Sequence, residues 1–94
     1  MKTITKRQRQ RLEAALRAKI RHYEKCMALM PSLDAEVFAA GMSLVGNNHM
    51  GLVNWLCTPA RSLGYKVPLV AARTAKGRRT VINILGALDD GGYL

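Results

Sequence analysis

Two histidines and two cysteines carry the side chains best suited to chemistry in this sequence: His22, Cys26, His49 and Cys57. His22 and Cys26 lie four residues apart, which places both on one face of a helix, and His49 with Cys57 could complete a four-ligand zinc site. The two pairs differ in spacing, however, and the sequence contains no Cys-x-x-Cys or His-x-x-x-His pattern. Isolated His and Cys residues are more often packing or surface residues, so we predict no metal site.

The sequence contains six carboxylates, two of which are the adjacent Asp89 and Asp90. A nucleophilic Cys or Ser needs a base, an orienting group and oxyanion donors, and no such set is evident. Gly91-Gly92 precedes no helix, so it does not form a phosphate-binding loop. We therefore predict a protein without catalytic residues and without a cofactor.

The charge of +9 is concentrated at the N-terminal end, where residues 1–25 hold nine basic and two acidic side chains. Such asymmetry favours an acidic partner, either nucleic acid or an acidic protein face. A basic helix can neutralise phosphates, whereas base reading needs a helix presented by a supporting fold. A solvated basic face is the alternative. The residues that we assign to nucleic-acid contact are Lys6, Arg7, Arg9, Arg11, Arg17 and Arg21.

The sequence predicts a long first helix over residues 6–30, because apolar side chains recur at helical spacing. They form what we call the apolar stripe: Leu12, Leu16, Ile20, Tyr23, Met27 and Met30. A helix of this length spans ~38 Å, whereas a compact chain of this size is roughly 32 Å across. We expect the helix to overhang the domain, fray in its first ten residues, or pair with a second copy as a homodimer. Pro31 should end it.

Shorter helices should follow, with Ser32 as N-cap of the second, an Asn capping the third at 49–57, and Thr74 capping the last at 75–88. Between them, Gly64 closes one turn and Pro68 starts a short helix. We predict an all-α bundle of about five helices, divided into a basic N-terminal helix (1–31) and a helical domain (32–94). Trp55 and Leu56 should anchor its core.

No apolar segment approaches the roughly 20 residues of a membrane span, and the N-terminus has no apolar leader. The two cysteines are isolated, as is usual for reduced thiols in the cytosol. These observations predict a cytoplasmic protein that does not use a membrane.

One block of sequence carries a recognisable pattern: W-L-x-T-P-x-x-x-L-G-x-x-x-P-L from Trp55 to Leu69, a Thr-x-x-Gly helix start at Thr74, and a Leu-Gly-x-x-acidic-x-Gly ending. Together they resemble the toxin-binding domain of Xre/MbcA/ParS-type antitoxins, over about residues 37 to 94. Read from the residues alone, most of this pattern encodes turns and packing, and Gly77 lets the last helix approach its neighbour closely.

The resemblance implies a partner, a toxin of the RES-type fold that consumes NAD or transfers ADP-ribose, whose active site such antitoxins occlude. It also implies that the C-terminal segment reaches into the toxin cleft, with arginines on the same side as secondary candidates. Simple fraying of this tail is the alternative. The residues that we assign to toxin contact are Arg61, Arg73, Asp89, Asp90, Gly91, Gly92, Tyr93 and Leu94.

This sequence departs from the family pattern at its N-terminal end. Typical members carry a helix-turn-helix domain there, whereas here a single basic helix precedes the toxin-binding block. The departure fits a stand-alone toxin-binding module, or a diverged member that has kept the fold for another partner. The alternative function is that of a small basic nucleic-acid-binding regulator, for example one encoded by a phage or mobile element, acting through that helix.

Overall fold

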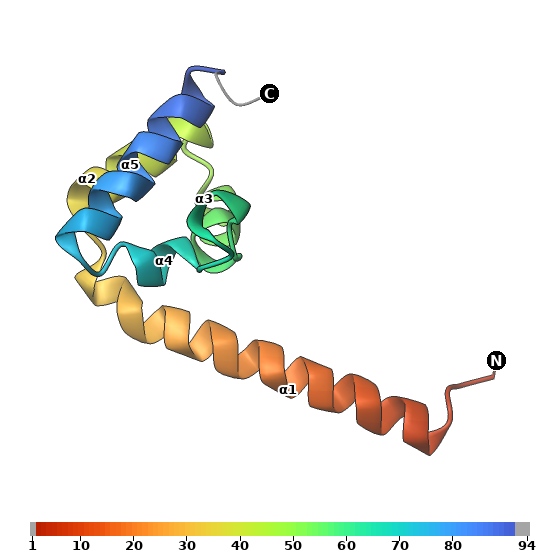
Figure 1. Cartoon of the computed structure of the whole chain (residues 1–94). Coiled ribbons are helices and arrows are strands. Elements are labelled where there is room, and N and C mark those ends of the chain that lie inside the picture. Colours follow the sequence, from red (N-terminus) through yellow and green to blue (C-terminus); the bar gives the residue numbers. More distant parts are fainter. Residues whose placement is uncertain (1, 92–94) are drawn as a thin grey trace.

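The computed structural model describes residues 2–91, which fold into helices joined by short turns (Figure 1). The predicted all-α class with five α-helices is confirmed, and no strand occurs between residues 2 and 91. The elements are α1 (Lys6–Leu29), the 3₁₀ turn η1 (Met30–Ser32), α2 (Ala35–Leu44), α3 (His49–Cys57), η2 (Arg61–Leu63), α4 (Pro68–Ala71) and α5 (Ala75–Asp89).

The core lies among α2, α3, α4 and α5, and α2 packs along α5 (Figure 1). Val37 of α2 and Val81 and Leu85 of α5 are fully buried, and Leu56 of α3 is only 1% exposed. Gly41 of α2 lies directly against Leu52 of α3, where a β-carbon would collide with the leucine. The glycine therefore permits the close approach of these two helices.

Of the three predicted N-cap residues, two are confirmed and one is wrong. Asn48 accepts a hydrogen bond from Gly51 N–H, and Thr74 accepts one from Gly77 N–H. The cap of α2 is Asp34, not Ser32, since the Asp34 carboxylate accepts from the second and third amides of the helix. Ser32 instead donates to the carbonyl of Leu29, because η1 continues the chain for one more turn after α1.

The loop between α3 and α5 is set by residues with special backbone preferences. Gly64 closes η2 and Pro68 opens α4, both as predicted, and Gly64 does so in the left-handed conformation. Tyr65 is also left-handed, which the sequence did not indicate. Gly77 lies against the carbonyl of Ala71, so that any β-carbon there would collide with main chain. This confirms the close approach of α4 and α5 that we predicted at Gly77.

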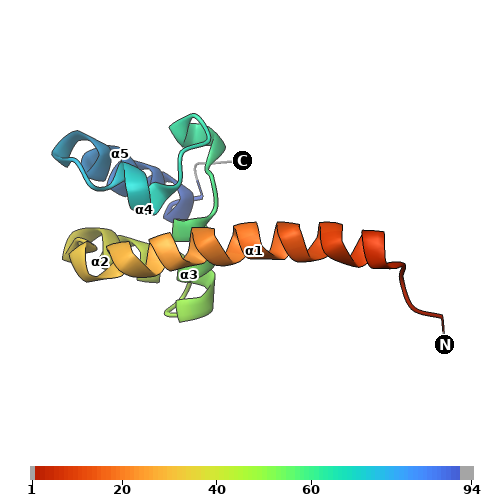
Figure 2. The ribbon, with the colours of Figure 1, turned by 90° about the horizontal axis from the view of Figure 1, so that it is seen from below.

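Helix α1 extends far beyond the rest of the molecule (Figures 1 and 2). The chain measures 48 × 27 × 24 Å and has a radius of gyration of 16.3 Å, against roughly 12 Å for a compact chain of this length. The predicted overhang is thus confirmed. The helix begins at Lys6 with a capping box between Thr5 and Gln8, so its first turn is not frayed as one of our expectations had it.

The domain attaches to α1 through a different face from the apolar stripe. Cys26 is buried, and the Nε2–H of His22 donates to the carbonyl of Cys57 at 2.6 Å. That carbonyl ends α3 and has no partner within its own helix, so the histidine supplies the missing donor. The apolar stripe lies about a quarter turn away around the helix and is mostly exposed.

Candidate functional site

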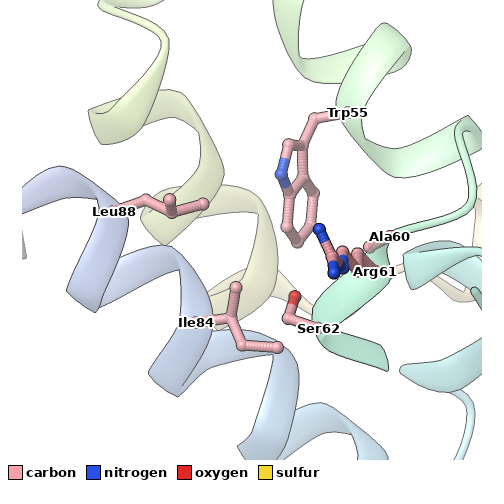
Figure 3. A pocket seen from close by; sticks show the side chains of 6 residues that line it. All are labelled: Trp55, Ala60, Arg61, Ser62, Ile84 and Leu88. Atoms are coloured by element: carbon pink, nitrogen blue, oxygen red, sulfur yellow. The ribbon is translucent and has the colours of Figure 1, made fainter. Parts of the chain in front are cut away.

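A hollow of about 620 Å³ lies between α5 and the segment that joins α3 to η2 (Figure 3). We call it the groove. Its lining residues are Trp55, Ala60, Arg61, Ser62, Ile84 and Leu88. Ile84 and Leu88 are one turn apart on α5 and form one wall, whereas Trp55, Arg61 and Ser62 form the other (Figure 3). The surface is mainly apolar and carries one cationic side chain.

Trp55 packs against the core, as we predicted, but only with part of its side chain. Leu56 and Leu52 occupy the buried face of α3, so the neighbouring Trp55 is half-buried and its indole faces into the groove (Figure 3). A large aromatic ring that is only partly covered by its own chain is a frequent anchor of protein interfaces. Trp55 therefore contributes both to the packing around the core and to the candidate site.

Arg61 is held in place by a tight loop. It is the first residue of η2, and the preceding Ala60 is bonded to the far end of the loop: its N–H donates to the carbonyl of Lys66 at 3.0 Å, and its carbonyl accepts from Tyr65 N–H at 2.9 Å. Gly64 and Tyr65 take positive φ angles to close this loop. The exposed guanidinium of Arg61 thus stands on a rigid base beside the Trp55 ring (Figure 3).

The predicted C-terminal contact segment begins where the groove ends. Asp89 follows Leu88 and accepts a hydrogen bond of 2.6 Å from the Ser43 hydroxyl of α2. Asp90 caps α5, and Gly91 is left-handed and turns the chain away from the helix. The remaining residues of that prediction, Gly92, Tyr93 and Leu94, lie outside the described residues.

Arg73 lies apart from Arg61. It borders a small hollow between η1 and α4, together with Leu29 and Leu69, and does not line the groove. Its backbone carbonyl faces the guanidinium of Arg78 at 3.5 Å. Of the two predicted arginines, the structure therefore brings only Arg61 to the groove.

Three of the four candidate metal-binding side chains meet at the seam between α1 and α3. The Nε2 atom of His22 lies 3.8 Å from the Cys26 sulfur, and Cys26 and Cys57 line the same apolar hollow. Burial, with a smaller contribution from Cys26, raises the pKa of the Cys57 thiol to about 11, so it stays protonated at neutral pH. His49 is exposed on the first turn of α3, and among residues 2–91 no three His, Cys, Asp or Glu side chains are placed to hold a metal.

The six basic residues assigned to nucleic-acid contact all lie on α1 and are exposed. Arg9 forms an ion pair within α1, because its Nε lies 3.9 Å from the carboxylate of Glu13. The others present a basic surface on the side of the helix away from the apolar stripe.

Sequence reasoning found Arg61 and the start of the tail but did not assign Trp55, Ile84 and Leu88 to a binding surface. A signal existed for the pair on α5: Ile84 and Leu88 are four residues apart, while Val81 and Leu85 form the neighbouring, fully buried row. One apolar row is enough for α5 to pack against the core, so the second row indicated an additional contact surface. No comparable signal distinguished Trp55 from Leu56.

No helix within residues 2–91 is long and apolar enough to cross a membrane. Comparison with curated proteins gives no match, and neither does comparison with solved structures. Residues 40–91 do match the family model of the antitoxin Xre/MbcA/ParS C-terminal toxin-binding domain. That segment covers more than half of the chain and includes every residue that lines the groove. The chain belongs to the Xre/MbcA/ParS antitoxin family, whose C-terminal domain binds a toxin.

Proposed function

We propose that this protein is an antitoxin that neutralises a RES-type toxin, one that consumes NAD or transfers ADP-ribose, by covering the entrance to its active site. The observation that carries the proposal is the groove: it lies wholly inside the family-matched segment and has the composition of a protein-binding surface. Aromatic and Arg side chains are enriched in such surfaces, and Trp and Arg account for many of their strongest contacts.

In this proposal the groove and the tail form one contact surface. Leu88 ends the apolar wall, and Asp89 and Asp90 continue from it as carboxylates. The hydrogen bond from Ser43 holds Asp89 at a fixed position, which limits the entropy lost when the partner binds. Residues 91–94 then extend from this fixed point toward the toxin cleft. The antitoxin needs no catalytic group in this proposal, because it acts by keeping substrate out of the toxin's active site.

The test uses a RES-type toxin encoded by the gene next to the gene for this chain. Co-expression with the wild-type chain should restore growth, and the two proteins should co-purify. Arg61→Glu should reduce rescue by reversing the one charge that residues 2–91 contribute to the groove, while Arg73→Glu, outside the groove, serves as the matched control. Equal rescue by both variants would remove the groove from the proposal.

Deletion of residues 91–94 tests the tail separately. We expect weaker inhibition of NAD consumption by the purified toxin while co-purification persists, because the groove still binds. Full inhibition by the shortened chain would exclude the tail as the occluding element.

A second function is favoured by one observation, the exposed basic surface of α1 outside the family-matched segment. In this second function, the basic surface of α1 binds nucleic acid through phosphate contacts, with little base specificity. Binding of a labelled duplex should weaken steeply with salt, and replacing Arg7, Arg11 and Arg17 with Gln should remove it. A band shift that survives in this variant would contradict this second function.

A further inference from the structure

The apolar stripe of α1 has no partner within the described chain. Leu12, Leu16, Ile20, Tyr23 and Met27 are between 48% and 73% exposed, and only Met30 is half-buried. These side chains project along a helix that is otherwise strongly basic. Leaving five large apolar groups in water on a single row is unusual for a monomer, where exposed apolar residues are normally scattered.

The stripe continues onto α3. Tyr23, Met27 and Met30 line an almost wholly apolar hollow of about 300 Å³ with Val53 and the two cysteines. Met50, one turn before Val53, is 71% exposed and extends the surface along α3. The exposed side chains of α1 and α3 together offer on the order of 700 Å² per copy, close to the roughly 800 Å² that each partner gives to a stable interface.

We propose that this surface binds a second copy of the chain, with the two α1 helices antiparallel. The spacing of the stripe is nearly the same in both directions. When the helices are paired about Ile20, Leu12 meets Met27 of the partner subunit and Leu16 meets Tyr23 of the partner subunit, and Ile20 packs near the twofold axis. A twofold interface requires such self-complementarity, because each contact occurs twice.

Charge selects the antiparallel direction. Residues 2–11 hold five basic side chains and no acidic one, so parallel pairing would place two such arms together. Antiparallel pairing places the two arms at opposite ends of the helix pair, which removes this repulsion.

The proposal goes beyond toxin binding and is independent of it, because the dimer surface shares no side chain with the groove. It also leaves most of the basic surface of α1 exposed. The opposite face of α1, away from the stripe, carries Ala14, which is exposed and provides a position for a control substitution.

Sedimentation velocity over a concentration series tests the dimer. The full chain should be dimeric at about 50 µM, and Leu16→Glu should raise the dimer dissociation constant at least about 100-fold, because each dimer would bury two carboxylates. Ala14→Glu adds the same charge on the other face and should stay within about threefold of wild type. A chain that remains monomeric at about 500 µM, or equal effects of the two variants, would overturn the proposal.

Disulfide cross-linking tests the direction. With mild oxidation by diamide, the double variant Leu12→Cys/Met27→Cys should form a covalent dimer much faster than either single variant, with the wild-type chain reporting the background from its buried cysteines. Faster cross-linking of Leu12→Cys alone would show parallel helices and overturn the antiparallel arrangement.

Discussion

The groove and the apolar stripe are apolar surfaces of different construction. The groove joins residues 55–62 to residues 84–88, so it exists only when α3, η2 and α5 are packed together. The stripe belongs to one helix and needs only the helical repeat. The family-matched segment contains the whole groove and none of α1. This difference matches the two proposals made above, toxin recognition in the groove and assembly on the stripe.

The largest expected difference between the two regions is in stability. Leu56→Ala removes a leucine that is 1% exposed and should lower the free energy of unfolding by about 2–5 kcal/mol. Leu16→Ala removes one that is 57% exposed and should change it by less than about 0.5 kcal/mol. Urea denaturation at concentrations where the chain is monomeric measures both. Similar losses would mean that the stripe is part of the core.

A second contrast lies within α5 and concerns how the groove wall is positioned. Gly77→Ala drives a β-carbon into the carbonyl of Ala71 and should cost about 1–3 kcal/mol by separating α4 from α5. Gly86→Ala meets nothing within 4 Å and should stabilise the helix by about 0.5–1 kcal/mol. Thermal denaturation of the two variants provides the comparison. A neutral Gly77→Ala would show that the approach of the two helices is not tight.

A smaller effect is expected at the seam where α1 meets α3. Because burial raises the pKa of Cys57 to about 11, the folded chain keeps a proton that the unfolded thiol releases near pH 9. The contribution of this thiol to stability is therefore complete below about pH 9 and is lost as the pH rises toward about 11. Melting temperatures of wild type and Cys57→Ala should converge over that interval. Parallel curves would place Cys57 in contact with solvent.

Much of this fold could be predicted from the sequence, because local signals determine it. Thr74, Asn48 and Pro68 start helices by their own hydrogen bonds or ring geometry, and Gly64 permits a left-handed turn. The cap of α2 was misassigned to Ser32 because the choice of Asp34 depends on η1, a turn that no local pattern indicated.

The site was less predictable, because exposure depends on packing between distant segments. Trp55 and Leu56 are neighbours of similar apolar character, yet one faces the groove and the other the core. Which of them is buried depends on where α5 lies. In the same way, the periodicity of α1 defined the stripe correctly but could not show that the domain attaches instead through His22 and Cys26.

The most direct test of the central claim is the affinity of the neighbouring toxin for Trp55→Ala and for Leu16→Glu, measured by titration calorimetry and expressed per chain. Trp55→Ala should weaken binding by at least about 30-fold, as expected for the loss of a central aromatic anchor. Leu16→Glu should bind within about threefold of wild type, since it alters only the stripe. Weak binding by Leu16→Glu together with unchanged binding by Trp55→Ala would contradict the assignment of toxin recognition to the groove.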